Sequence, residues 1–235
     1  MLVAVQRLDW WLCGAAPGRL VSATSVDRVS SVVSLDATRV SLFIDADHFR
    51  RCAVAGHEHL TGQSASASRV NIDGPAVSEW VDRAAVDLGL REASQTSPLP
   101  SPRRIYDILN TNRVRRWRQR HYHGVLAAEG FVVTSARVRC AERLHARAGL
   151  DLVQLTQSSN VDAALLLVGD GAYAGAVATA RRHGAHVVLL VPPVSSVLVA
   201  DSLRAAASRI VALHPEVFET LYHVVTDKRR GADRS

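Results

Sequence analysis

The second half of the chain alternates between short apolar runs and segments with helical spacing. An apolar run over residues 163–169 is followed by helical spacing over 172–182, then by Gly184, and then by a second apolar run over 186–191. A short apolar run bounded by turn residues is typical of a buried strand, and a glycine after a periodic segment is typical of a helix end. This order predicts a strand, a crossover helix and a second strand parallel to the first.

The same pattern predicts further elements on both sides of this unit. Strands are expected over 40–45, 105–108, 131–134 and 210–213, and helices over 112–129, 151–157, 197–207 and 215–224. Polar segments over 61–68 and 94–102 are expected to be loops. Strands that alternate with helices predict an α/β fold with a mainly parallel central sheet and helices on both faces.

One more helix is predicted in the first half of the chain. It starts at Pro75 and ends at Gly89. Its apolar positions fall at helical spacing and are Val77, Trp80, Val81, Ala84, Ala85 and Leu88.

The chain of 235 residues is long enough for one sizeable domain. We assign residues 39–226 to that domain and 227–235 to a polar C-terminal tail. Residues 1–38 show no sustained hydrophobic period, so we interpret them as a poorly ordered or peripheral N-terminal extension.

Cysteines and apolar runs indicate the environment of the protein. Cys13, Cys52 and Cys140 are odd in number, far apart and not spaced as metal ligands, so we expect free thiols in a reduced, cytoplasmic protein. The sequence has no uninterrupted apolar run of about 18 residues, the length that a membrane span requires. Arg7 and Asp9 interrupt the N-terminal apolar stretch, which argues against a secretory signal.

Two of the predicted strands run into aspartates, Asp45 and Asp170. Parallel sheets bind ligands outside the carboxyl ends of their strands, so the two carboxylates are expected at the same edge. Carboxylates that converge repel one another, and a cation such as Mg²⁺ or Mn²⁺ would relieve that repulsion. Asp47 could add a ligand directly or through water. The alternative for each aspartate is a helix cap, because Asp is a favoured residue at that position.

Four motifs resemble those of the NYN domain family, which belongs to the PIN-like nuclease superfamily. They are residues 43–48 (FIDADH), 148–151 (AGLD), 168–173 (VGDGAY) and 181–189 (RRHGAHVVL), and the resemblance spans about residues 40–215. The resemblance implies a three-layer PIN-like fold and a metal-dependent ribonuclease. It implies catalytic roles for Asp45, Asp47, Asp151 and Asp170, with Mg²⁺ or Mn²⁺ held by Asp45, Asp47 and Asp170.

Several positions depart from the family pattern. Gln157, Ala172 and Ser208 stand where the family usually has acids, Ala148 replaces its lysine, and His48 replaces its asparagine. Fewer carboxylates weaken a site for a strongly hydrated dication, although Mg²⁺ also binds through one or two carboxylates plus substrate phosphates. A NYN domain that binds RNA or a protein partner without cleavage is therefore the alternative to an RNA endonuclease.

Excess positive charge is concentrated in one segment. Between residues 102 and 147 there are eleven arginines and three acids. Arginine clusters contact phosphates, and an aromatic ring offers bases a stacking face, so the predicted partner is RNA, in single-stranded form. The candidate RNA-binding residues are Arg113, Arg116, Arg120, Arg137, Arg139, Arg143 and Arg147. The sequence leaves open whether the protein is a homodimer.

A solvated helix face is the alternative interpretation of this segment. In that case Val114, Trp117 and Leu126, with Tyr122, would form its core-facing side, and we expect Trp117 to pack against the sheet rather than to stack on bases.

Other candidate chemistries fit less well. The histidine pairs at 57 and 59 and at 121 and 123 lack the spacing of helical metal ligands. The DAD sequence at 45–47 and the GDG sequence at 169–171 are similar to motifs of haloacid dehalogenase-type phosphatases. That family also needs a lysine, and Lys228, the only lysine, comes late in the chain.

Overall fold

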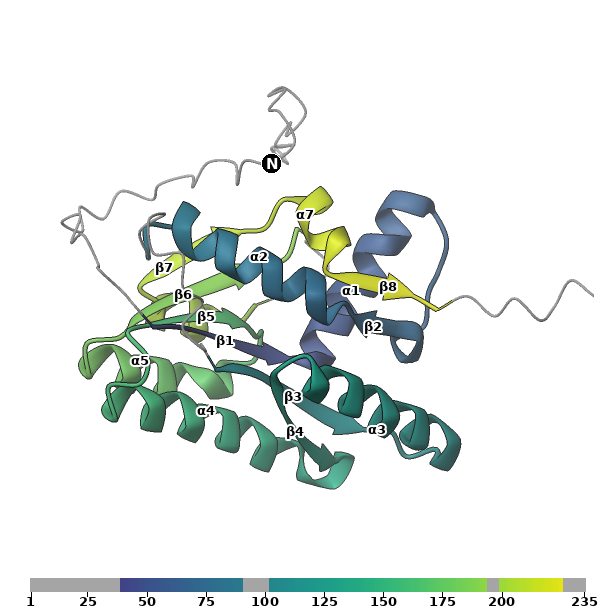
Figure 1. Ribbon diagram of the computed structural model, residues 1–235, viewed down its shortest axis with the longest axis horizontal. Helices are drawn as coiled ribbons and strands as arrows, with labels where there is room; N and C mark the ends of the chain where they lie inside the picture. Colours follow the sequence, from purple (N-terminus) through teal and green to yellow (C-terminus); the bar gives the residue numbers. More distant parts are fainter. Residues whose placement is uncertain (1–38, 91–101, 194–198, 226–235) are drawn as a thin grey trace, which may run out of the picture.

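A six-stranded parallel sheet forms the centre of the protein (Figure 1). The computed structural model describes residues 39–90, 102–193 and 199–225. The strands stand in the order β4-β3-β1-β5-β6-β7, and every neighbouring pair is parallel. Their bounds are β1 Val40–Asp45, β3 Arg103–Leu109, β4 Phe131–Arg137, β5 Ala163–Leu167, β6 His186–Val191 and β7 Arg209–Ala212.

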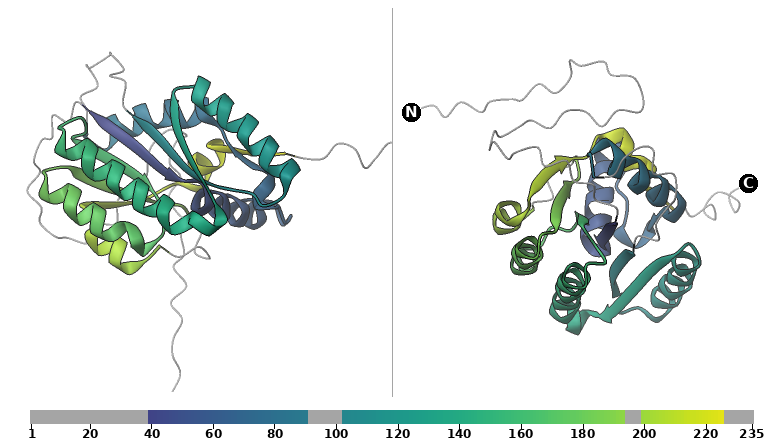
Figure 2. Two further views of the ribbon diagram at one scale, coloured as in Figure 1. Left: turned by 90° about the horizontal axis from the view of Figure 1, so that it is seen from below. Right: turned by 60° about the vertical axis from the view of Figure 1, so that its left-hand side comes forward.

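Helices cover both faces of this sheet, so the fold is a three-layer α/β fold (Figure 2). One face carries α1 Ala46–Thr61, α2 Gly74–Asp87 and α7 Pro215–Thr220, with α3 Arg113–Ala128 at the edge beside β4. The other face carries α4 Ala141–Gln157, α5 Ala174–Arg182 and α6 Asp201–Ala206. Alternate residues of the central strand supply the two cores: Leu42 and Ile44 face the first layer, and Phe43 faces the second.

Short elements complete the domain. The strands β2 Val70–Ile72 and β8 Tyr222–Val224 form a separate antiparallel pair. Three short 3₁₀ helices lie at η1 Ala67–Arg69, η2 Val138–Cys140 and η3 Gly171–Tyr173. Within the described ranges, no helix is both long and apolar enough to cross a membrane.

Most of the predicted elements are confirmed. The strands β1 and β6 have the predicted bounds, and the β5-α5-β6 unit is parallel as expected. The predicted helix after Pro75 is α2, and its buried apolar residues include Val77, Trp80 and Val81. Gly130 has a φ of 89°, a conformation that suits glycine at the end of α3. The loop predicted at 94–102 and both terminal segments lie wholly or largely outside the described residues.

Three predictions about the elements are wrong. The helix expected at 151–157 is α4, which begins ten residues earlier, at Ala141. The helix expected at 215–224 ends at Thr220, and the chain then forms β8, because these residues pair with β2. No helix was predicted after Asp45, yet α1 spans Ala46–Thr61 and is capped by Asp45 at its start and Gly62 at its end.

Candidate functional site

Asp45 ends β1 at the carboxyl edge of the sheet and caps α1. Its side chain is buried, and its Oδ1 accepts hydrogen bonds from the backbone N–H groups of Asp47 at 3.0 Å and His48 at 3.2 Å. Its Oδ2 accepts a hydrogen bond from the Tyr173 hydroxyl at 3.3 Å. Burial raises the pKa of Asp45 above its ordinary value, although the His48 N–H and the charge of His145 oppose that shift. Asp45 therefore has the capping role that was the alternative to metal binding.

His145, on α4, lies between Asp45 and Asp170. Its Nε2 is 3.5 Å from Oδ2 of Asp45, and its Nδ1 is 3.5 Å from Oδ2 of Asp170. The imidazole also packs against Tyr173, with ring centroids 5.3 Å apart. A protonated imidazole donates from both nitrogens and so can pair with both carboxylates, whereas a neutral one can donate to only one of them. The two strand-end aspartates thus lie on the two sides of one ring.

These residues do not form a closed metal site. The part of the chain that the structure describes contains no group of three or more His, Cys, Asp or Glu side chains placed to hold a metal ion. The side chain of Asp47 is half exposed and lies 3.3 Å from Nε of Arg51. A cation shared by Asp45 and Asp170 would have to take the place of His145. With only these two carboxylates as protein ligands, Mg²⁺ would also need water molecules and substrate phosphates to complete its coordination.

Asp170 is exposed and caps η3, where its Oδ1 accepts a hydrogen bond from the backbone N–H of Ala172 at 2.8 Å. The residue before it, Gly169, packs against α1. A Cβ atom on Gly169 would lie less than 3.0 Å from two ring atoms of His48. Glycine at this position therefore allows the end of β5 to approach α1 and places Asp170 near Asp45.

Asp151 lies inside α4 and not at its start, where the helix predicted over 151–157 placed it. It is buried, and three side chains donate to its carboxylate: Arg104 at 2.9 Å, Tyr106 at 2.8 Å and Arg147 at 2.8 Å. Two guanidinium groups neutralise this carboxylate and leave little charge for a cation. In the structure Asp151 fastens α4 to β3, and Arg147, a candidate RNA-binding residue, is engaged in the same cluster.

His145 was not predicted as a site residue because the predicted start of α4, at Asp151, lies ten residues after its true start at Ala141. Leu144, Ala148 and Leu152 are buried at helical spacing along α4. Extending this spacing from Asp151 toward the N-terminus predicts that the helix already includes Leu144 on its buried face and His145 next to it.

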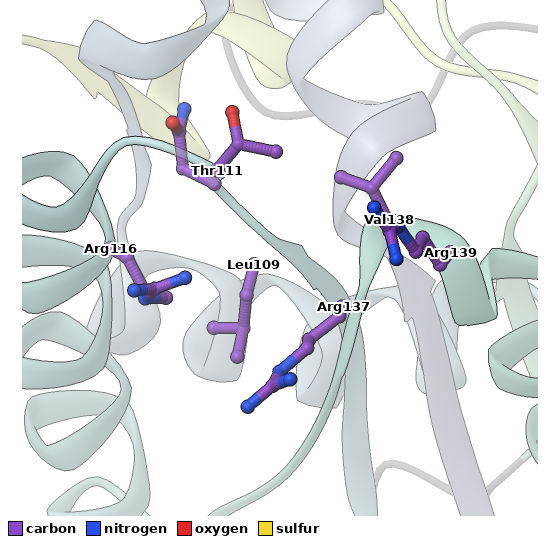
Figure 3. A pocket seen from close by; sticks show the side chains of 7 residues that line it. Leu109, Thr111, Arg116, Arg137, Val138 and Arg139 are labelled. Atoms are coloured by element: carbon purple, nitrogen blue, oxygen red, sulfur yellow. The ribbon is translucent and has the colours of Figure 1, made fainter.

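A second feature of the same sheet edge is a pocket of about 210 Å³ where β3 and β4 end (Figure 3). Arg116 reaches it from α3, Arg137 from the end of β4 and Arg139 from η2. Its remaining lining residues are Leu109, Asn110, Thr111 and Val138. The ion pairs found among the described residues do not include these three arginines, so the pocket carries positive charge without a carboxylate.

Trp117 is exposed, which corrects the expectation that it packs against the sheet. Its side chain is 68% exposed and stacks on His121, with ring centroids 6.0 Å apart and an angle of 12° between the rings. Val114 is exposed as well, and Leu126 is the one buried residue of α3. Tyr122 packs against the core as Leu126 does, so the predicted anchor is confirmed for these two residues and wrong for Val114 and Trp117.

Polar contacts also hold α3 in place, and they centre on Asp107 of β3. Arg50 of α1 binds this buried carboxylate through two nitrogens at 2.6 and 2.7 Å. From α3, Gln119 and His123 each reach it at 2.7 Å. Burial alone would raise the pKa of Asp107, but the hydrogen bonds from Arg50 and His123 outweigh it and hold the pKa well below its usual range. The signal in the sequence was an acid inside an apolar strand.

The other candidate RNA-binding arginines are spread over two helices. Arg113 and Arg120 are exposed on α3, and Arg143 is exposed near the start of α4. His121 stacks on Trp117, whereas His123 contacts Asp107, so the two histidines are not arranged as a pair of metal ligands.

Comparisons with known proteins add no functional assignment. No family model matches the sequence, and no curated protein matches it. A similar solved structure is that of a protein of unknown function from Vibrio parahaemolyticus. It shares 16% sequence identity, with a TM-score of 0.49, over 80% of this chain and 98% of that one.

Proposed function

We propose that the protein binds single-stranded RNA on the surface formed by α3, the end of β4 and η2, which we call the α3 surface. The observation that carries this proposal is the exposed ring of Trp117 on α3, the helix that also supplies Arg116 to a pocket whose three arginines have no carboxylate partner among the described residues. The resemblance to the NYN family is part of the same proposal, as is a cytoplasmic location, which the free thiols of Cys52 and Cys140 support.

Two kinds of contact usually hold a single strand on a protein: ionic contacts with the backbone phosphates and stacking contacts with the bases. Arginines neutralise backbone phosphates, and an aromatic ring stacks on a base whatever its identity. The α3 surface offers both: Arg113, Arg116 and Arg120 lie on the helix that carries Trp117. Since Trp117 makes no contact with the core of the domain, its exposure has no evident structural purpose.

Replacing Trp117 with alanine is expected to weaken RNA binding by about 5- to 150-fold, since base stacking on an aromatic contributes about 1–3 kcal/mol. Trp117→Phe should retain most of the affinity because it keeps a ring. Fluorescence anisotropy with a labelled pyrimidine-rich RNA measures the dissociation constants. Ile210→Ala is the matched control, because Ile210 is 40% exposed on β7, at the opposite edge of the sheet.

Two results would count against this binding mode. One is equal affinity of the Trp117→Ala and Ile210→Ala variants for RNA. The other is an affinity that does not fall with added salt, because each phosphate contact to a single strand should contribute a slope of about −0.7 in a plot of log K against log salt.

Metal-dependent cleavage of RNA is a second candidate function. It is favoured by the approach of Asp45 and Asp170 at the carboxyl edge of the sheet, on the two sides of His145. Asp45 and Asp170 would hold Mg²⁺ or Mn²⁺, with Asp47 assisting, and the ion would supply charge stabilisation at the scissile phosphate. The buried, capping position of Asp45 and the ring between the carboxylates argue for binding without cleavage as the first choice.

Incubating labelled RNA with the protein and Mn²⁺ separates the two candidates. We expect RNA that is retarded in a native gel and remains intact. Cleavage that is lost in Asp170→Asn but kept in Asp201→Asn, an acid at the start of α6, would instead establish the second candidate. His145→Ala then tests the role of the ring. Cleavage should rise if the ring blocks the ion, and it should fall if the ring takes part in catalysis.

A further inference from the structure

The pocket at the ends of β3 and β4, which we call the arginine pocket, brings together three arginines from three different elements. Arg39, Arg50 and Arg104 are partly or wholly buried among the secondary-structure elements, and each is paired with an aspartate. Arg116, Arg137 and Arg139 come from three different elements to line one hollow, and the ion pairs of the described ranges leave all three without an acid. Like charges gathered in this way repel one another, and an anion between them would remove the repulsion.

The size of the arginine pocket limits what it can hold. Its volume of about 210 Å³ is below the range of about 300–1,000 Å³ that is usual for pockets enclosing a whole small molecule. It therefore suits a small anionic group with a few water molecules rather than a complete nucleotide. Most of the lining surface is apolar and includes Leu109 and Val138, and the polar part comes from the arginines, Asn110 and Thr111.

The arrangement of the guanidinium groups favours an anion with several acceptor oxygens. Figure 3 shows Arg116 on one side of Leu109, with Arg137 and Arg139 on the other. The N-terminus of α3 does not compete for this role, because the Asn112 side chain already accepts from its free N–H groups. The donors of the pocket are thus side chains that come from both sides of Leu109.

A terminal phosphate meets these requirements better than an internal one. A phosphate monoester carries a charge of about −1.5 to −2 at neutral pH and has three free acceptor oxygens. An internal diester has a single charge and two free oxygens, and its chain must leave the pocket in two directions. The positive charge of three arginines is closer in size to the charge of the monoester than to that of the diester, and their number equals the number of its free oxygens.

We propose that the arginine pocket binds the terminal phosphate monoester of an RNA strand, so that the protein recognises a phosphorylated RNA end. This proposal rests on the proposed RNA binding by the α3 surface. The 5′ and the 3′ phosphate share the same chemistry, and the experiment decides between them.

The test compares one RNA octamer in three forms, with a 5′ phosphate, with a 3′ phosphate and with hydroxyls at both ends, by competition fluorescence anisotropy. The full chain is expected to bind one phosphorylated form about tenfold or more tightly than the hydroxyl form, as charge-assisted hydrogen bonds would give. The Arg137→Gln/Arg139→Gln variant should lose this preference. Because both arginines also belong to the α3 surface, its affinity for the hydroxyl form should fall as well, so the readout is the ratio of the affinities for the phosphorylated and the hydroxyl forms.

Arg120→Gln is the matched control, since Arg120 lies on α3 but does not line the arginine pocket. It should weaken all three forms alike and keep the preference. Equal binding of all three forms by the unaltered chain overturns the end recognition and leaves RNA binding intact. A preference that Arg120→Gln reduces as much as the pocket variant also overturns it, because general charge would then be the cause. If no form binds, both the end recognition and the proposed RNA binding are wrong.

Discussion

Replacing Asp107 with alanine is expected to lower the free energy of unfolding by about 3–5 kcal/mol, the usual loss when one partner of a buried ion pair is removed. The guanidinium of Arg50 would remain with its side chain only 13% exposed and with no carboxylate to pair with. Gln119 and His123 would lose the acceptor that holds α3 against β3. Urea denaturation followed by circular dichroism measures the loss.

Asp47→Ala is the control for this prediction, because the Asp47–Arg51 pair is exposed on the same helix as Arg50 and such pairs contribute at most about 1 kcal/mol. Equal losses in the two variants would contradict the role assigned to Asp107.

The response to acid tests the same site through protonation. The pKa of Asp107 is depressed in the folded protein, where burial opposes but hydrogen bonds from Arg50 and His123 dominate. Its contribution is therefore fully present above the unfolded-state pKa of about 3.9 and is lost as the pH falls through the folded pKa. The unaltered chain should lose stability below about pH 4 by this contribution, and Asp107→Ala should lack it.

Replacing Gly169 with alanine is expected to destabilise the protein by about 1–3 kcal/mol or more, because the new methyl group would overlap the His48 ring. The backbone itself would accept alanine, since Gly169 is not among the glycines with positive φ. The ring has little room to move: His48 is 1% exposed, and its Nε2 lies 3.6 Å from Sγ of Cys52. Burial lowers the pKa of His48 to about 4, so the ring is neutral at pH 7.

A double substitution identifies the clash as the cause. His48→Ala removes the ring, so Gly169→Ala/His48→Ala should be more stable than the sum of the two single losses predicts, by about 0.5–3 kcal/mol. Gly175→Ala is the matched control: it lies inside α5 with nothing within 4 Å of an added Cβ, and alanine there should be neutral or stabilising. Strict additivity in thermal or urea unfolding would show that the two residues are not coupled.

The regular strands could be predicted from the sequence because their apolar content is local and continuous. The strands β1 and β6 are recognisable from their own residues, whatever they pair with. The helix α1 was not predicted because its buried face includes His48 and Arg50, which look like surface residues. Gly169 leaves room for the His48 ring, and Asp107 neutralises the charge of Arg50. Both Gly169 and Asp107 are far away from α1 in the sequence.

The candidate site likewise has features that follow from local sequence and features that depend on residues far away in the chain. Asp45 and Asp170 could be predicted because strand ends of a parallel sheet converge by geometry alone. The exposure of Trp117 could not be predicted, since Leu126, Tyr122 and the polar contacts with Asp107 hold α3 in place without it. The arginine pocket likewise depends on where three separate elements end.

The position of β1 in the middle of the sheet has a consequence for how the chain folds during synthesis. Val40 pairs with Ala163, and Ile44 pairs with Leu167, on a strand that a ribosome makes more than a hundred residues later. Until β5 has emerged, one hydrogen-bonding edge of β1, a strand that is fully buried in the folded protein, stays open. Pairings over such long stretches of chain close slowly. The nascent protein therefore passes through an extended period in which it depends on protection from aggregation.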